Sequence, residues 1–205
     1  MKRLPVVSTI IVLMAVAAMI VLGIWQLRRA EEKNALIARY ATASGLPEMA
    51  YPAVAFGDDL LFRRAGGICL EPLNPRIEGG LNAKGVAGWR HIVACRTGAE
   101  GPGMIVDIGW SKQFDTVPDW KGGQVSGIIS RQPDHSSLIA RAFGKGAAPA
   151  LMLVAGTPAD GLEPSAPPSL RDVPNNHFAY AVQWFLFAAI AAIIYGLALK
   201  SRRRA

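Results

Sequence analysis

Two long apolar runs stand out in the pattern of hydrophobic and polar positions. The first covers residues 4–25 and the second covers residues 178–199, and neither contains a charged residue. A helix rises about 1.5 Å per residue, so either run would cover about 33 Å, enough to cross the hydrocarbon core of a bilayer. The pattern therefore predicts a transmembrane helix at each of these two positions.

A cleaved secretory signal is the alternative interpretation of the first run. Ala15, Val16 and Ala17 match a small-x-small cleavage site after a short apolar region. The apolar run continues beyond this site to Trp25, however, which makes it too long for the core of a signal peptide. We therefore interpret the first run as a retained anchor, with Trp25 at the outer interface of the membrane.

Cationic residues follow the second apolar run directly. They are Lys200, Arg202, Arg203 and Arg204. Because lysine and arginine beside a span are retained in the cytoplasm, the C-terminal side of this helix is predicted to be cytoplasmic. Two spans then place the N-terminal side in the cytoplasm as well, although cations lie on both sides of the first run. The long segment between the spans is predicted to be exported, largely regardless of its charge.

Between the two runs the pattern changes twice. Residues 26–44 keep helical propensity and are predicted to form a helical stalk, which Gly45 ends. Residues 51–156 show short apolar runs broken by glycine and proline, which is typical of a β-rich domain. Residues 157–174 contain five prolines and are predicted to be a semi-extended connector back to the membrane.

Five strands are predicted within the β-rich region. They cover residues 68–73, 89–96, 104–110, 124–130 and 151–155. The second and third are expected to pair as one hairpin with a long glycine-rich turn. The predicted fold class is thus a membrane protein of the α+β type, in which two transmembrane helices flank a β-rich extracytoplasmic domain.

Charge does not indicate a nucleic-acid partner. The formal net charge is +7, but four of the cations form the C-terminal cluster and others flank the first span. That placement favours contact with lipid headgroups over a groove-binding patch. We therefore expect the lipid bilayer as a partner and no nucleic acid.

The two cysteines, Cys69 and Cys95, lack the spacing of a zinc or thioredoxin-type site. If the middle of the chain is extracytoplasmic, a disulfide between them is permitted. The alternative to a disulfide is that Cys95 is a small core residue on a strand and that Cys69 is unrelated to it.

Candidate chemistry lies at the start of the second apolar helix. With successive residues 100° apart, His177, Tyr180 and Trp184 share one broad face. A neutral imidazole is a common ligand of haem iron, and aromatic rings supply apolar walls. The alternative is a polar residue at a helix start beside interfacial aromatics. The same face carries a small-residue ladder that is expected to admit the first helix, namely Ala188, Ala192 and Gly196.

The remaining histidines are weaker candidates. His91 is expected to be a partly buried sheet residue, and His135 a solvated loop residue. The segment around Ser126 is misspaced for a nucleophile elbow, and no phosphate-binding loop with lysine occurs in the sequence. A hydrolase is therefore disfavoured.

Two segments resemble the Surfeit locus protein 1 family of cytochrome c oxidase assembly factors. Residues 22–37, LGIWQLRRAEEKNALI, are similar to its L-G-x-W-Q-x-x-R-x-x-x-K segment, and residues 175–185, NNHFAYAVQWF, to its N-x-H-x-x-Y-A-x-x-W-F segment. A third family segment, R-G-W-V-P, is kept only at Gly109 and Trp110. The chain thus resembles a divergent bacterial member.

The resemblance implies a non-enzymatic factor that helps haem a reach the catalytic subunit of a haem-copper oxidase. His177 would be the ligand of the haem iron, and Tyr180, Trp184 and Trp25 the walls of the haem pocket. Gly23 and Gln26 would be packing and interface residues. The implied partners are the cytochrome c oxidase catalytic subunit and the haem a synthesis machinery. The implied location is the bacterial cytoplasmic (inner) membrane, with both termini cytoplasmic and the central domain periplasmic.

Two alternatives belong to other functional classes. One is a membrane scaffold that stabilises an oxidase assembly intermediate without binding haem. The other is an unrelated membrane-anchored periplasmic enzyme that uses His91, Asp107 or Ser126.

Overall fold

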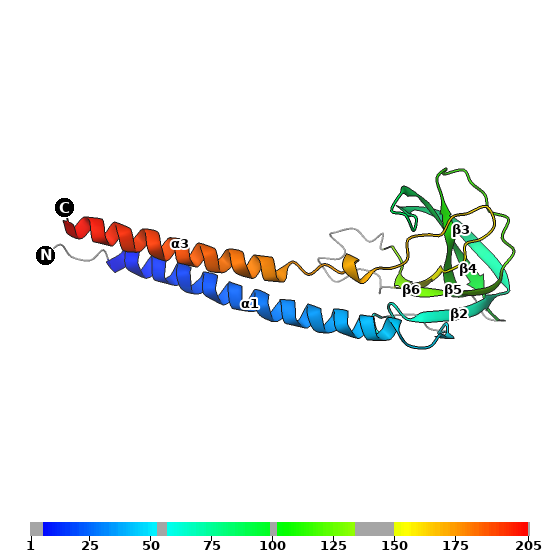
Figure 1. Cartoon of the computed structure of the whole chain (residues 1–205), viewed down its shortest axis with the longest axis horizontal. Coiled ribbons are helices and arrows are strands. Elements are labelled where there is room, and N and C mark those ends of the chain that lie inside the picture. The colour runs from blue at the N-terminus through cyan, green and yellow to red at the C-terminus, as the bar shows by residue number, and fades with distance from the viewer. Residues whose placement is uncertain (1–5, 53–56, 99–101, 134–149, 205) are drawn as a thin grey trace. The chain divides into compact units, whose positions relative to one another are not determined.

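The computed structural model describes residues 6–52, 57–98, 102–133 and 150–204 (Figure 1). The chain divides into two units. The helical unit comprises Met1–Ala38 and Val173–Ala205, and the sheet unit comprises Arg39–Asp172. Two long apolar helices thus flank a sheet-rich central region, which confirms the predicted fold class.

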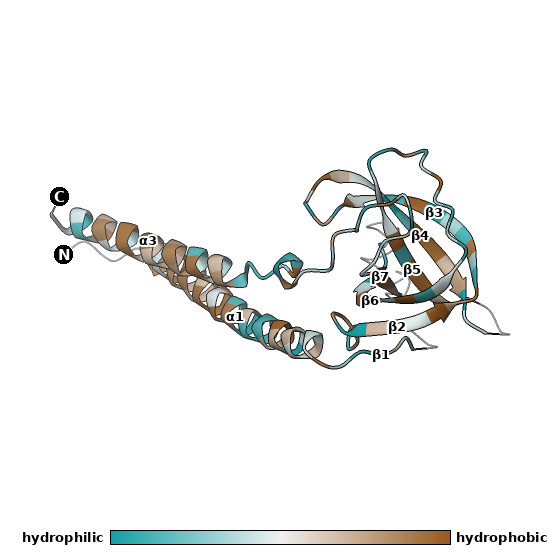
Figure 2. Ribbon diagram, turned by 45° about the vertical axis from the view of Figure 1, so that its right-hand side comes forward, coloured by the Kyte–Doolittle hydropathy of each residue, from teal (hydrophilic) through white to brown (hydrophobic). Residues whose placement is uncertain are grey.

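Two helices account for the helical unit. Helix α1 covers Val6–Ser44 and helix α3 covers His177–Arg204. Both are long and apolar enough to cross a membrane. Helix α1 runs without a break through the predicted span and the predicted stalk. Its 39 residues cover about 58 Å, roughly twice the thickness of a bilayer core, so about half of the helix extends beyond the membrane core. Both helices are largely hydrophobic along the ribbon (Figure 2). Many of their apolar side chains are exposed, as a lipid environment requires.

The helices contact each other along a seam with a heptad-like spacing. The less exposed positions of α1 recur at alternating steps of three and four residues, and they include Thr9, Val12, Val16, Met19, Gly23, Gln26 and Ala30. Those of α3 recur in the same way, and they include His177, Ala181, Trp184, Ala188, Ala191 and Tyr195. The hydroxyl oxygens of Thr9 and Tyr195 lie 2.6 Å apart, and Gln26 contacts His177 farther along, so the two helices are antiparallel. This spacing is that of a left-handed helix pair.

The predicted ladder of small residues on α3 is wrong except at its first position. Ala188 is buried, but Ala192 is exposed and a side chain at Gly196 would meet open space. Steps of four residues advance by 400°, so such a ladder drifts about 40° per step away from the partner helix. A seam that alternates steps of three and four stays on the partner.

A seven-stranded sheet forms the second unit. Its strands are β1 Met49–Ala50, β2 Arg64–Cys69, β3 Glu71–Leu81, β4 Ala87–Arg96, β5 Pro102–Ser111, β6 Gly123–Arg131 and β7 Leu151–Ala155. They lie in the order β1-β2-β6-β7-β5-β4-β3. Neighbouring strands are antiparallel except for the pairs β1/β2 and β5/β7. Every residue of β7 is buried, so the core lies against the middle of the sheet.

The hairpin predicted between the second and third strands is confirmed as β4 and β5, which pair antiparallel from Trp89 opposite Ser111. The single strand predicted at residues 68–73 is wrong. The chain breaks at Leu70, so these residues end β2 and begin β3. Strand β3 itself extends to Leu81 and was otherwise missed by the sequence analysis.

A disulfide joins Cys69 at the end of β2 to Cys95 on β4, with an S–S distance of 2.09 Å. These strands are not neighbours in the sheet. Beside the bridge, the backbone N–H of Leu70 donates to the carbonyl oxygen of Arg96 over 2.8 Å. The sheet therefore curves until its two outer parts meet at this end.

The proline-rich connector packs along the sheet over much of its length. The backbones of Trp110 and Glu163 exchange two hydrogen bonds of 2.7 and 2.8 Å, and the N–H of Ala159 donates to Ile108 over 2.8 Å. Farther on, the N–H of Ala166 donates to the carbonyl of Leu81 over 2.9 Å. The connector thus supplies backbone partners to β5 and β3.

Candidate functional site

His177 is the first residue of α3. The carbonyl oxygen of Asn176 accepts the first helical hydrogen bond, from the N–H of Tyr180 over 3.2 Å. The imidazole therefore projects from the first turn of the helix, at the end of the apolar run away from the cationic cluster. The side chain is partly exposed.

Gln26 of α1 holds the ring of His177. The distance between Nδ1 of His177 and Oε1 of Gln26 is 2.7 Å. An amide oxygen only accepts hydrogen bonds, so Nδ1 carries the proton and donates it. The other ring nitrogen, Nε2, then carries a lone pair. Within the described ranges, Nε2 makes no hydrogen bond, so it is available as a metal ligand.

The two helices approach closely one turn from this pair. A Cβ atom built on Gly23 would lie 2.6 Å from a ring carbon of Phe185, which is closer than real Cβ contacts permit. Gly23 and Gln26 occupy successive positions of the seam. The absence of a side chain at Gly23 thus leaves room for the ring of Phe185, one turn from Gln26.

A second polar pair lies beyond His177. The side-chain amide of Asn175 donates to Oδ1 of Asn34 over 2.7 Å. The side-chain oxygen of Asn175 is buried and has no hydrogen-bond partner among the described residues. A buried acceptor without a protein partner calls for a donor from outside the chain, such as a water or a bound molecule.

The three predicted aromatic residues occupy different environments. Trp184 lies on the seam seven residues after His177, is partly buried, and packs edge-on against Phe187 with ring centroids 6.3 Å apart. Trp25 and Tyr180 are 51% and 49% exposed. Trp25 directly precedes Gln26, and Tyr180 lies one turn after His177. Apolar ring surface is therefore exposed on both helices next to the histidine.

The sequence analysis assigned Gln26 only to packing or the interface, and it missed the hydrogen bond to His177. One local signal was available. Gln26 is the first polar residue after the apolar run of residues 4–25, and a polar side chain at the edge of such a run needs a hydrogen-bond partner where it is removed from water.

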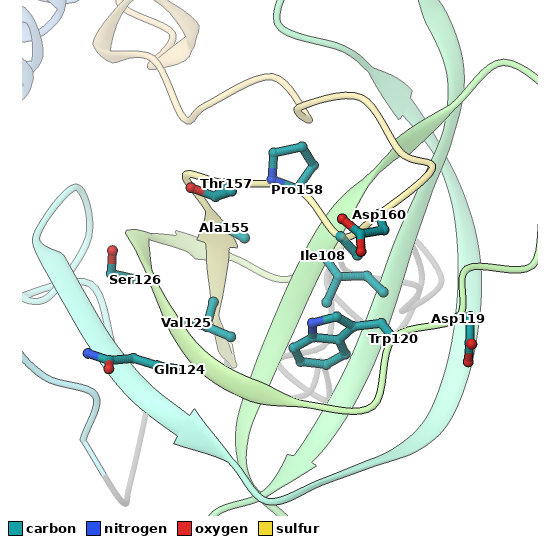
Figure 3. A pocket seen from close by; sticks show the side chains of 11 residues that line it. Ile108, Asp119, Trp120, Gln124, Val125, Ser126, Ala155, Thr157, Pro158 and Asp160 are labelled. Carbon is teal, nitrogen blue, oxygen red and sulfur yellow. The ribbon is translucent and has the colours of Figure 1, made fainter.

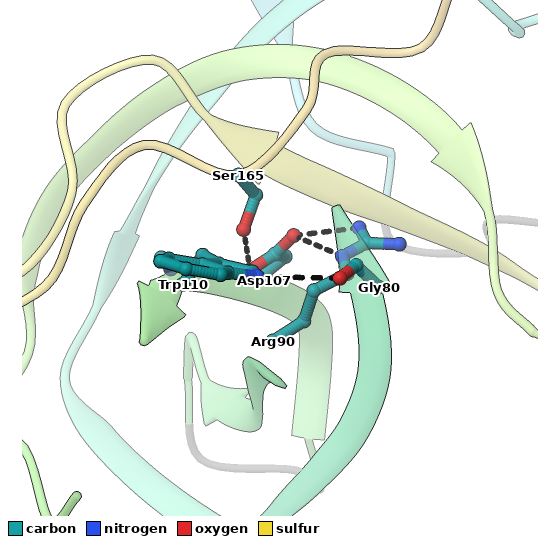
Figure 4. A network of polar contacts seen from close by, with 6 residues as sticks. Gly80, Arg90, Asp107, Trp110 and Ser165 are labelled. Atoms are coloured by element: carbon teal, nitrogen blue, oxygen red, sulfur yellow. Dashed lines mark hydrogen bonds and ion pairs between the residues drawn. The ribbon is translucent and has the colours of Figure 1, made fainter. Parts of the chain in front are cut away.

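A buried ion pair occupies the middle of the sheet unit (Figure 4). Asp107 on β5 is fully buried, and its Oδ2 accepts from Nε and Nη2 of Arg90 over 2.7 and 2.6 Å. Its Oδ1 accepts from the hydroxyl of Ser165 over 2.8 Å and from the N–H of Gly109 over 3.1 Å. Burial raises the pKa of the Asp107 carboxyl, and the Arg90 guanidinium opposes this rise. The network pins the connector, through Ser165, to the sheet.

Gly109 and Trp110, the Gly-Trp pair of β5, also contribute to packing between the connector and the sheet. Gly109 has a φ of 141°, and a Cβ there would lie 2.8 Å from Leu162. Only glycine combines this backbone angle with so little space. Trp110 is buried, and its indole N–H donates to the carbonyl of Gly80 over 3.2 Å (Figure 4). The structure therefore accounts for Gly109 and Trp110 by the close packing of the connector against the sheet.

His91 is a structural residue, as the sequence analysis expected. It lies on β4, is 4% exposed, and its Nε2 is 2.8 Å from the hydroxyl of Ser111. That hydroxyl donates to the carbonyl of Gln113 over 2.7 Å, so it accepts from His91. Burial lowers the pKa of His91, and nearby Asp107 opposes this shift. His135, the other weak candidate, lies outside the described residues.

A cavity of about 420 Å³ in the sheet unit is lined by Trp120, Ser126 and Asp160 among others (Figure 3). Neither His91 nor Asp107 lines it. No hydrogen bond joins any two of His91, Asp107 and Ser126 within the described part of the chain. The structure thus does not bring His91, Asp107 and Ser126 together as a hydrolytic site. The described residues also contain no group of three or more acidic, histidine or cysteine residues placed to bind a metal ion.

A comparison with protein families gives a match to the SURF1 family model over residues 13–189, well over half of the 205 residues. The chain belongs to the SURF1 family. The matched range includes both segments on which the sequence resemblance rested, so that prediction is confirmed. A search of curated proteins found no match. The SURF1 family is known for cytochrome oxidase assembly factors and is not a family of catalytic enzymes.

Proposed function

We propose that this SURF1-family protein holds haem a as cargo on its way to the catalytic subunit of a haem-copper oxidase, with His177 as ligand of the iron. The proposal rests on the hydrogen bonding of the His177 imidazole, which among the described residues leaves one ring nitrogen free. Its Nδ1 is occupied by Gln26 over 2.7 Å. A histidine that ligates a metal through one nitrogen and donates a hydrogen bond through the other is the usual arrangement in proteins.

The surroundings of His177 fit a large, flat, mostly apolar cargo. The exposed rings of Trp25 and Tyr180, together with the partly buried Trp184, would form the apolar walls. The buried oxygen of Asn175 adds an acceptor close in sequence to the histidine. When bound, the haem iron supplies an electron-pair acceptor for the imidazole nitrogen. The protein's part is binding and release, without catalysis.

The proposed location is the bacterial cytoplasmic (inner) membrane, with the sheet unit in the periplasm and both termini in the cytoplasm. The cations after residue 199 support a cytoplasmic end of α3. The disulfide between Cys69 and Cys95 supports an oxidising compartment for the sheet unit, because such bonds are rare in the cytosol. A reporter that is active only in the periplasm should work when it is fused at Gly122 and fail when it is fused after Arg204. The opposite pattern would overturn this orientation.

The haem proposal is tested by the absorption spectrum of the protein purified from cells that make haem a. Wild type should show a Soret band, and His177→Ala should weaken or abolish it. Tyr195→Phe is the matched control, because it removes the hydrogen bond to Thr9 at the other end of the same helix pair. A Soret band that is equally strong in His177→Ala and in wild type would remove His177 from the site.

A scaffold that binds no haem is the second candidate, and the surface of the sheet unit favours it. Val117 and Phe114 are 88% and 59% exposed. Beside them lies a cavity of about 290 Å³ that is lined largely by apolar side chains, including Pro118 and Trp120. Exposed apolar residues of this kind mark sites of protein contact. Under this candidate Val117→Asp would impair oxidase assembly, whereas His177→Ala would leave it intact.

A further inference from the structure

We propose that Gln26 is a positioning residue, which holds His177 in the Nδ1–H tautomer and thereby presents Nε2 as the ligand atom. This inference rests on the proposed function for its purpose, because the choice of nitrogen matters only if His177 binds a metal. The bond joins residues 151 positions apart in sequence, and so it depends on the pairing of α1 with α3.

The geometry gives Gln26 control over the tautomer. The 2.7 Å separation of Oε1 and Nδ1 lies at the short end of the range for N–H···O hydrogen bonds. If the proton moved to Nε2 while the Gln26 amide kept this orientation, two acceptors would face each other at this distance. The amide would have to turn over and donate from its NH2 group to restore the hydrogen bond, so the observed orientation favours the Nδ1–H form. The hydrogen bond at one ring nitrogen thus decides which nitrogen is free to ligate.

Gly23 is the second part of this arrangement. Its missing side chain lets the ring of Phe185 lie against the backbone of α1, since even a Cβ would come within 2.6 Å of that ring. A methyl group at Gly23 would have to displace this ring, one turn from Gln26.

The Asn34–Asn175 bond stabilises the same register from the other side. Asn175 lies two residues before His177, the first residue of α3, and Asn34 lies two helical turns beyond Gln26 in α1. The pair at His177 is therefore bracketed by Gly23 on one side and by Asn34 on the other. Such supporting contacts hold a ligand in position before its metal arrives.

The test measures the tautomer directly and needs no haem. Full-length protein with ¹⁵N-labelled histidine is placed in lipid nanodiscs, and the ring nitrogens are observed by NMR. The His177 signals are assigned by their absence in His177→Ala. In wild type Nδ1 should be protonated and Nε2 should not. Gln26→Leu should remove this preference, whereas Gln26→Glu should keep it because a carboxylate also accepts.

Matched variants separate positioning from general damage. Gln183→Leu makes the same change at an exposed position of α3 and should leave the His177 tautomer as in wild type. A His177 ring protonated at Nε2 in wild type, or an unchanged tautomer in Gln26→Leu, would overturn the proposal.

Haem loading provides a second readout. Loss of the second hydrogen-bonded partner of a ligating histidine weakens metal affinity roughly 10- to 100-fold. We therefore expect Gln26→Leu to weaken haem binding by a factor in that range, and Gln26→Glu to retain binding and lower the midpoint potential through added charge on the imidazole. An equal affinity and potential in all three proteins would contradict the positioning role.

The two proposals fail in different ways. If wild type shows no Soret band but Gln26→Leu alters the tautomer, the positioning role stands and the haem function falls. If His177→Ala abolishes the Soret band but Gln26→Leu leaves the tautomer unchanged, the haem function stands and the positioning role falls.

Discussion

Removal of the disulfide between Cys69 and Cys95 is expected to destabilise the sheet unit substantially. The two cysteines are 26 residues apart in sequence. The chain-entropy model gives about 3.5 kcal/mol near 25 °C for closing a loop of that length. Both side chains are at least 98% buried, so serine replacements would add unpaired hydroxyls at about 1–3 kcal/mol each. The double variant Cys69→Ala/Cys95→Ala therefore isolates the contribution of the bridge.

The expected change in melting temperature follows from the size of the unit. In a domain of the length of Arg39–Asp172, 1 kcal/mol corresponds to roughly 3–5 °C. The double variant should therefore melt roughly 10–17 °C below wild type. The helices carry none of this effect, because the bridge joins β2 to β4.

The assay is thermal unfolding of the full-length protein in nanodiscs, followed by the infrared amide I band of the sheet, which is separate from that of the helices. Wild type is compared with reduced wild type and with the double variant, and a non-reducing gel shows that the bridge forms in the cell. Equal melting temperatures in all three samples would refute the reasoning. A bridge that is absent from protein extracted under acid trapping would also count against a periplasmic sheet unit.

Two further predictions concern buried groups of the sheet unit and use the same infrared assay. Arg90→Met leaves the Asp107 carboxylate buried without its cation, which should cost about 3–5 kcal/mol. Arg90→Met/Asp107→Asn should recover part of that loss, because the uncharged amide oxygen still accepts from Ser165 and Gly109; equal melting of the single and double variants would argue against an ion pair. Burial lowers the pKa of His91 below 6.5, so in the window just below that pH the unfolded chain binds more protons than the folded protein, and stability should fall as the pH drops through it. His91→Gln should flatten this part of the stability curve, and an unchanged slope would assign the pH dependence to another group.

The elements that were predicted correctly are those with a strong local pattern. The two apolar helices and the hairpin of β4 and β5 follow from uninterrupted apolar runs and from alternation with a period of two. Strand β3, in contrast, contains Pro72, Pro75 and two glycines, and its pairing with β4 is irregular between Leu73 and Arg76. It lies at the edge of the sheet, where one side needs no hydrogen-bond partners and proline is tolerated. The residues of β3 therefore lack the local strand pattern from which a strand is predicted.

Only part of the candidate site could be predicted from the sequence. His177, Tyr180 and Trp184 follow from positions on a single helix, which spacing alone relates. The hydrogen bond from His177 to Gln26 depends on the register between two helices that are far apart in the chain. The failed ladder at Ala192 and Gly196 has the same cause, because the handedness of the pair decides which face of α3 meets α1. Register and handedness emerge only when both helices are packed.

The most direct test of the account is the haem a spectrum of purified wild-type protein beside that of His177→Ala, with Tyr195→Phe as the control. The account predicts a Soret band in wild type and in Tyr195→Phe, and its loss or strong reduction in His177→Ala. A band of equal strength in all three proteins, or its absence from wild type that was purified from cells rich in haem a, would contradict it.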